Sequence, residues 1–225
     1  MTGLSLLGLG YATPFLEMFQ EEAESVAALM PAGQGVLTWP SEGPYLSTLV
    51  DETCFPVADA SVDRVLIIHN LELSESVRLM LREVWRVLAP EGKILIAVPN
   101  RRGFWARFDS TPFGHGRPYS RGQLDRLLRD CMFEPTTYSS TLYVPPINLE
   151  IFLKSASAWE KLGSKFWPVF SGVLLVEAQK SVYSAIGVGE AVPASSRLST
   201  AQSGFPRNTT FLNDKPEKKD IRPAA

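Results

Sequence analysis

The chain has 225 residues, a formal net charge of −2 and an apolar fraction of 45%, a composition typical of a globular protein with one sizeable core. Acidic and basic residues nearly balance, so no overall basic field exists to attract nucleic acid or anionic lipid. The two cysteines, Cys54 and Cys131, are too few for a disulfide framework or a cysteine-rich zinc site and indicate a reducing compartment. No apolar run reaches the roughly 20 residues of a membrane helix, so we expect a cytoplasmic protein without stable membrane insertion.

Short apolar runs alternate with segments of helical periodicity in the first part of the chain. Strands are expected at 4–9, 26–30, 45–50, 62–69 and 94–98, where the apolar runs are short and continuous. Helices are expected at 14–24 and 77–88, where apolar residues recur every three or four positions, and residues 89–92 should end the second helix. This alternation predicts an α/β fold, a Rossmann-like sandwich with helices on both faces of a mostly parallel sheet.

The second half of the chain continues this pattern and then loses it. Ser120 and Gln123 have the spacing of a capping box before a helix that buries Leu124, Leu127 and Leu128. A strand at 136–144, a helix at 148–162 and a last strand at 169–178 should follow. From about Ser184 polar, Pro and Gly residues replace apolar ones, so we expect a domain of residues 1–183 and a disordered tail of residues 184–225.

The first apolar run leads into a glycine turn, LLGLGYATPFL. In a doubly wound sheet, ligands bind beyond the carboxyl ends of the strands, and Gly8 and Gly10 would let the backbone turn tightly beside a ligand. A dinucleotide fingerprint needs a third glycine where this chain has Thr13, which disfavours a nicotinamide-dependent oxidoreductase. The alternative is that the two glycines only pack the strand against the following helix.

Three segments, in this order, resemble the successive motifs of the class I S-adenosylmethionine-dependent methyltransferases: LLGLGYATPFL, LVDETCFPVADASVDRVLIIHNLE and LREVWRVLAPEGKILIAVPNRRGFW. The resemblance covers roughly residues 4–134 and is to the methyltransferase type 11-like group, which is related to the quinone-biosynthesis methyltransferases. It implies a three-layer sandwich around a sheet of about seven strands, the last of them antiparallel. It also implies S-adenosyl-L-methionine as the methyl donor and transfer to an unidentified small-molecule acceptor.

The resemblance further implies which residues contact the donor. The glycine turn would wrap its methionine end, the acidic pair after the third strand would flank the adenine, and the end of the fourth strand would lie under the sulfonium. The residues implied are Gly8, Gly10, Tyr11, Met30, Asp51, Glu52, Thr53, Ile68 and His69, with Asn70 beside them. A carboxylate can accept hydrogen bonds from the adenine amino group, and an aromatic face such as that of Tyr11 suits a sulfonium.

The sequence departs from the family pattern at three places. Ala12 stands in place of the third glycine, and Met30 in place of the acidic residue that holds the ribose hydroxyls. A thioether is only a weak hydrogen-bond acceptor. We also expect the domain to lack the helix that the family places before the first strand, since Met1 is only a few residues ahead of the glycine turn. These departures leave open the alternative that the domain is a non-catalytic binding or regulatory module.

Methyl transfer depends mainly on positioning, and a general base helps when the acceptor is a hydroxyl or an amine. The chain has only two histidines. His69 follows the fourth strand and would point toward the methyl group, or alternatively is only hydrogen-bonded at the strand end. The loop 100–118 is long enough to cover an acceptor pocket with His115, Arg117 and Tyr119, or alternatively is purely structural. His115, His69 and Tyr119 are therefore the candidate catalytic residues, and no metal is expected.

Overall fold

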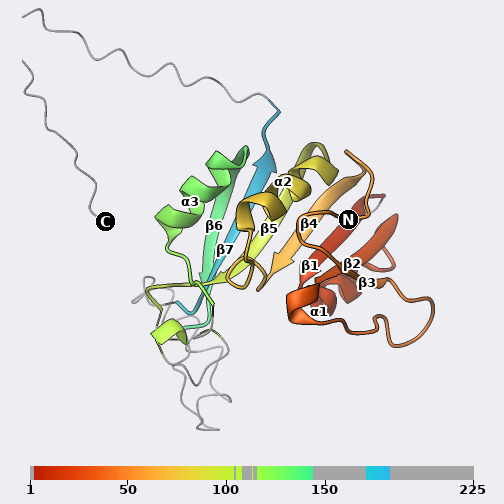
Figure 1. Ribbon diagram of the computed structural model, residues 1–225, viewed down its shortest axis with the longest axis horizontal. Coiled ribbons are helices and arrows are strands. Elements are labelled where there is room, and N and C mark those ends of the chain that lie inside the picture. The colour runs from red at the N-terminus through yellow and green to blue at the C-terminus, as the bar shows by residue number, and fades with distance from the viewer. Residues whose placement is uncertain (1–2, 104, 108–112, 114–115, 144–170, 183–225) are drawn as a thin grey trace, which may run out of the picture. The chain divides into compact units, whose positions relative to one another are not determined.

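The computed structural model describes residues 3–103, 105–107, 113, 116–143 and 171–182, all within one compact unit, Met1–Ala185. In this part of the chain seven strands form one sheet in the order β3-β2-β1-β4-β5-β7-β6 (Figure 1). The strands are β1 Ser5–Gly10, β2 Ser25–Pro31, β3 Ser47–Val50, β4 Val62–Ile68, β5 Leu88–Pro99, β6 Phe133–Thr141 and β7 Val173–Lys180.

Strands β1 to β5 pair in parallel, and β7 runs antiparallel to both of its neighbours, β5 and β6. The predicted fold class, a Rossmann-like α/β fold with a mostly parallel seven-stranded sheet and an antiparallel last strand, is therefore confirmed. The predicted helix at 148–162 and the predicted tail at 184–225 lie outside the described residues. No helix of the described segments is long and apolar enough to span a membrane.

Two helices cover one face of the sheet. Helix α2, Val77–Val87, buries Met80, Leu81, Val84 and Val87, as its periodicity predicts. Helix α3, Arg121–Asp130, begins with the predicted capping box, since Ser120 Oγ accepts a hydrogen bond from the backbone N–H of Gln123 and the Gln123 side chain accepts one from the N–H of Ser120. Both helices pack on the same core cluster, together with inward-facing residues of β1, β4 and β5.

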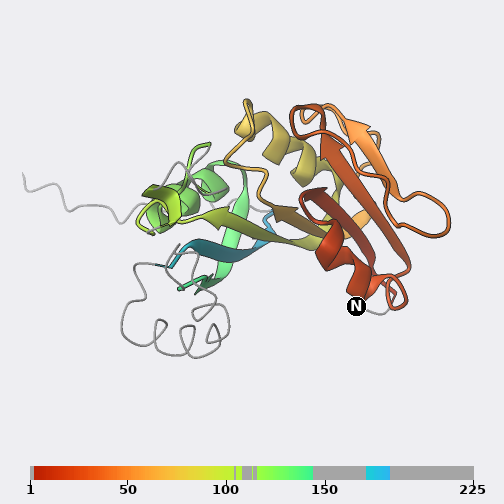
Figure 2. The ribbon, with the colours of Figure 1, turned by 90° about the horizontal axis from the view of Figure 1, so that it is seen from below.

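The opposite face carries the much shorter helix α1, Thr13–Leu16, followed by the 3₁₀ turn η1, Glu17–Phe19 (Figure 2). The predicted helix over 14–24 is thus wrong in length. The reason lies in the tertiary structure: the backbone N–H of Glu24 bonds the carbonyl of Leu4, which ties the chain back to the start of β1. Strand β2 can then begin at Ser25, beside Ser5.

Candidate functional site

The strand order reverses between β1 and β4, since the chain proceeds from β1 to β2 and β3 in one direction and from β4 to β5 in the other. Such a reversal is where open α/β sheets bind ligands, beyond the carboxyl ends of the strands. Two hollows lie at this edge in the described part of the protein. The larger has a volume of about 660 Å³ and the smaller one of about 70 Å³.

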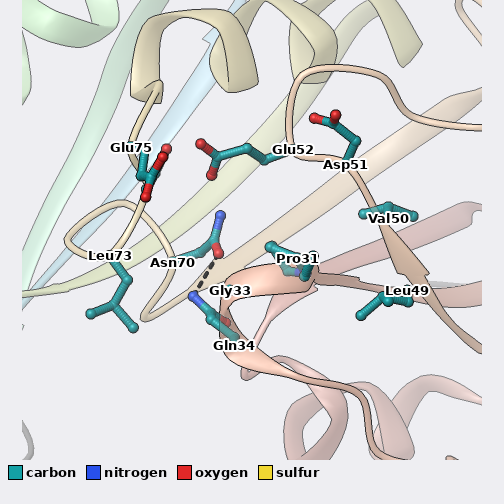
Figure 3. A pocket seen from close by; sticks show the side chains of 12 residues that line it. Pro31, Gly33, Gln34, Leu49, Val50, Asp51, Glu52, Asn70, Leu73 and Glu75 are labelled. Atoms are coloured by element: carbon teal, nitrogen blue, oxygen red, sulfur yellow. Dashed lines mark hydrogen bonds between the residues drawn. The ribbon is translucent and has the colours of Figure 1, made fainter.

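The carboxyl ends of three strands and the residues that follow them form the larger hollow: Pro31–Gln34 at the end of β2, Leu49–Glu52 at the end of β3, and Asn70 with Leu73–Glu75 after β4. Figure 3 shows two of its carboxylates, Glu52 and Glu75, on the side of the hollow away from Gln34. Leu49 and Leu73 are each about half exposed at its rim. The hollow therefore combines apolar side chains with acidic hydrogen-bond acceptors.

The predicted residues Asp51 and Glu52 both line this larger hollow. Asp51 accepts hydrogen bonds from the hydroxyl and the backbone N–H of Thr53, at 2.7 and 2.8 Å, and these bonds hold the pKa of the Asp51 carboxyl below its ordinary value. Glu52 accepts a hydrogen bond of 2.9 Å from the backbone N–H of Ser76, the residue before α2. Thr53 thus orients Asp51 and does not itself line the hollow.

The glycine turn lies beside the smaller hollow, which Gly10, Tyr11 and Met30 line. Gly10 has φ +77°, and a Cβ there would lie 2.6 Å from the carbonyl oxygen of Ile68. The backbone N–H of Tyr11 bonds the same oxygen at 2.9 Å. A glycine is therefore required by the protein's own β1–β4 contact, and a side chain at Gly10 would first strain the backbone, not enter an open path for a ligand.

Gly8 has a packing role. A Cβ at Gly8 would lie 2.5 Å from Leu16 Cδ1 and 2.7 Å from the Cβ of Ala12, both at α1. Gly8 lines neither of the two hollows. This position agrees with the alternative that Gly8 only packs β1 against α1.

At the end of β2 the polar group that faces the site is Gln34, which the sequence analysis missed. The Met30 side chain is buried, and its sulfur accepts a hydrogen bond from the backbone N–H of Leu37 at 3.0 Å. Gln34 lines both hollows and donates through Nε2 to Oδ1 of Asn70 at 2.7 Å. The signal in the sequence was a polar residue between two glycines directly after the second strand. Its side chain separates the glycine turn from the carboxylates.

The predicted catalytic residues His69 and Tyr119 each interact with Glu72, a residue that the sequence analysis did not single out. Nδ1 of His69 lies 2.8 Å from Oε1 of Glu72. Burial and the negative charge of Glu72 raise the pKa of Tyr119. Ile68, before His69, is buried. Neither Ile68 nor His69 lines the two hollows, and His115 lies outside the described residues.

Comparisons with known proteins agree with this architecture. Residues 7–96 match the family model described as a methyltransferase domain. A solved S-adenosylmethionine-dependent methyltransferase from Archaeoglobus fulgidus has a TM-score of 0.58 and 19% identity, over 79% of this chain and 86% of that one. A search of curated proteins found no match.

Two other solved structures are similar to the same extent. A chain of the complex between the Trm112 methyltransferase activator and a methyltransferase from Haloferax volcanii has a TM-score of 0.58 and 17% identity, over 81% of this chain and 84% of that one. The [4+2]-cyclase SpnF has a TM-score of 0.57 and 20% identity, over 81% of this chain and 76% of that one. Its name shows that this fold also serves a cyclase, so the fold alone does not define the reaction. This chain has the class I S-adenosylmethionine-dependent methyltransferase fold, and its residues 7–96 match the methyltransferase-domain family.

Proposed function

We propose that the protein transfers a methyl group from S-adenosyl-L-methionine to a small-molecule acceptor and that the adenosyl group lies in the larger hollow. The supporting observation is the position of this hollow of about 660 Å³, beyond the ends of β2, β3 and β4 and next to the reversal of strand order. Its volume is in the range of about 300–1,000 Å³ typical of small-molecule sites. The family match runs from Leu7 in β1 to Ile96 in β5. It therefore includes β2, β3 and β4, the strands whose ends form the hollow.

The residues around the hollow fit an adenosyl group. Leu49 and Leu73 offer apolar contact to a flat base, and both are exposed enough to make it. Glu52 and Glu75 can accept hydrogen bonds from amino and hydroxyl groups. Their negative charge, with that of Asp51, also favours the cationic sulfonium of the donor.

The donor supplies an activated methyl group when bound, so the protein's task is to bind, orient and exclude water. In this proposal Gly10 and Tyr11 shape the methionine end of the site, while Asp51 and Glu52 flank the base. Gly8, Met30, Thr53 and Ile68 act behind these residues by holding the backbone and side chains in place. The quinone-biosynthesis subgroup remains a prediction from the sequence motifs alone.

Calorimetric titration with S-adenosylhomocysteine tests the proposal on a matched pair of variants. Leu73→Arg puts a long charged side chain into the hollow, whereas Leu79→Arg changes a leucine of similar exposure, on α2, that does not line it. We expect the wild type and Leu79→Arg to bind equally and Leu73→Arg to bind at least about tenfold more weakly, a loss of about 1.4 kcal/mol. Wild-type protein that gives no binding heat would contradict the proposal and favour the non-catalytic module.

A further inference from the structure

Glu72 is a buried carboxylate whose two oxygens have different surroundings. It is 5% exposed, and its Oε1 lies 2.8 Å from Nδ1 of His69. Its second oxygen, Oε2, is buried without a hydrogen-bond partner in the described part of the protein. Burial of a carboxylate with one oxygen unsatisfied is costly, so the position of Glu72 calls for a functional reason.

The contact between His69 and Glu72 bears on which nitrogen of the imidazole carries the proton. A carboxylate without a proton can only accept hydrogen bonds, so a bond from Nδ1–H of His69 to Glu72 would leave the lone pair of a neutral ring on Nε2. The backbone of His69 has φ +51°, a left-handed conformation that is uncommon for a residue with a side chain. The backbone N–H of His69 bonds the carbonyl of Ala97 at 3.0 Å, which fixes this conformation on β5.

The segment after β5 contacts the backbone of Leu71 and Glu72. The backbone N–H of Arg117 bonds the carbonyl of Glu72 at 2.8 Å, and a Cβ at Gly116 would lie 2.6 Å from that carbonyl oxygen. The hydroxyl of Tyr119 bonds the carbonyl of Leu71 at 3.5 Å. Glu72 is thus the titratable group that contacts the imidazole. In the described part of the segment after β5, Arg117 and Tyr119 are the titratable residues that bond to the backbone of Leu71 and Glu72.

Aromatic rings lie on the outer side of the imidazole. The ring of Phe113 lies 5.0 Å from that of His69, between centroids, and Trp105 meets Phe113 edge to face at 5.7 Å. Rings in this arrangement favour contact with a further planar group. The His69 side chain is 25% exposed, so a small molecule can reach it.

We infer that Glu72 is a positioning residue that holds His69 as the base for a hydroxyl-bearing, planar methyl acceptor. This inference rests on the proposed function. The acceptor oxygen forms the new bond to the methyl carbon, and the electron pair of the broken sulfur–carbon bond stays on sulfur. The hydroxyl proton passes to Nε2 of His69 and then to water.

The tautomer of His69 gives the first test, and it needs no acceptor. Since the chain has two histidines, a nitrogen NMR spectrum of the imidazoles assigns His69 by its loss in His69→Gln. We expect the Nδ1–H tautomer in the wild type and a mixture in Glu72→Gln, because an amide can either accept from Nδ1–H or donate to Nδ1. Glu91→Gln, an exposed carboxylate in β5, is the matched control and should leave the tautomer unchanged. An Nε2–H tautomer in the wild type would overturn the inference.

Methyl transfer to catechol and to benzylamine, as hydroxyl and amine probes, gives the second test. We expect the wild type to methylate catechol, and we expect the rate of this transfer to fall about 100-fold or more in Glu72→Gln. The affinity for S-adenosylhomocysteine should stay unchanged within about twofold. Transfer to benzylamine alone, or transfer to catechol that is equal in Glu72→Gln and the wild type, would overturn the inference. Absence of S-adenosylhomocysteine binding to the wild type would instead contradict the proposed function and leave the tautomer result standing.

Discussion

The side-chain amide of Gln34 donates a hydrogen bond of 2.7 Å to Oδ1 of Asn70 and so bridges the end of β2 to the end of β4 (Figure 3). Gln34 lines both hollows and separates the glycine turn from the acidic residues. Because Gln34 lines both hollows, we expect a ligand that contacts Gly10 and Asp51 at the same time to displace this amide. Breaking one such hydrogen bond costs about 0.5–1.5 kcal/mol net.

Replacement of Gln34 by alanine should therefore strengthen binding of S-adenosylhomocysteine. The bridge no longer has to be broken, so the dissociation constant should fall by about 2–10-fold, as measured by calorimetry. Gln20→Ala, at a glutamine that lines neither hollow, is the control and should bind as the wild type does. Weaker binding in Gln34→Ala would show instead that the Gln34 amide contacts the nucleoside directly.

Arg86 fixes the connection between β3 and β4, which carries Asp51 and Glu52 and has no helix of its own. Its guanidinium donates to the backbone carbonyls of Phe55 and Val57, at 3.0 and 2.9 Å, and to Glu83 on the same helix at 2.8 Å. This contact holds the pKa of the Glu83 carboxyl below its ordinary value. The acidic edge of the larger hollow is thus anchored on α2.

Arg86→Met should lower the free energy of unfolding by about 1–3 kcal/mol, because two backbone carbonyls and the carboxylates of Glu83 and Asp59 lose a donor. Urea denaturation measures this change. Arg78→Met is the control, since among the residues that the structure describes Arg78 forms an ion pair with Asp130 alone, and both side chains are more than half exposed. Such a pair contributes about 0–1 kcal/mol. Equal losses in the two variants would mean that Arg86 acts as an ordinary surface charge.

The fold could be predicted from the sequence because its signals are local. Each buried parallel strand appears as a short apolar run, and the capping box at Ser120 and Gln123 marks the start of α3 without reference to the rest of the chain. The length of α1 could not be predicted in this way, because it is limited by a bond from Glu24 to Leu4 that forms only in the folded protein.

The site was predicted less completely than the fold, for a related reason. Asp51 and Glu52 were implied by the resemblance to the methyltransferase motifs, and they line the larger hollow. Gln34 contacts Asn70, which is 36 positions away, and only the folded sheet brings the ends of β2 and β4 close enough for that bond. Glu72 contacts His69 three positions before it, a spacing that by itself does not show that the two side chains meet. Gly8 satisfied a ligand-binding pattern, yet the contact that requires a glycine there is with Leu16.

Tyr138 provides a prediction of pH dependence outside the site. Its hydroxyl donates to Asp125 at 2.9 Å, and burial together with this bond raises the pKa of Tyr138 to about 12. Since the folded pKa is above that of the unfolded chain, about 10, the neutral phenol stabilises the fold below pH 10. This stabilisation is lost as the pH rises through about 12. Titration of tyrosinate absorbance should show a step near pH 12 that is lost in Tyr138→Phe. The control Tyr45→Phe, at an exposed tyrosine, should keep this step. A step near pH 12 that survives in Tyr138→Phe would assign it to another tyrosine.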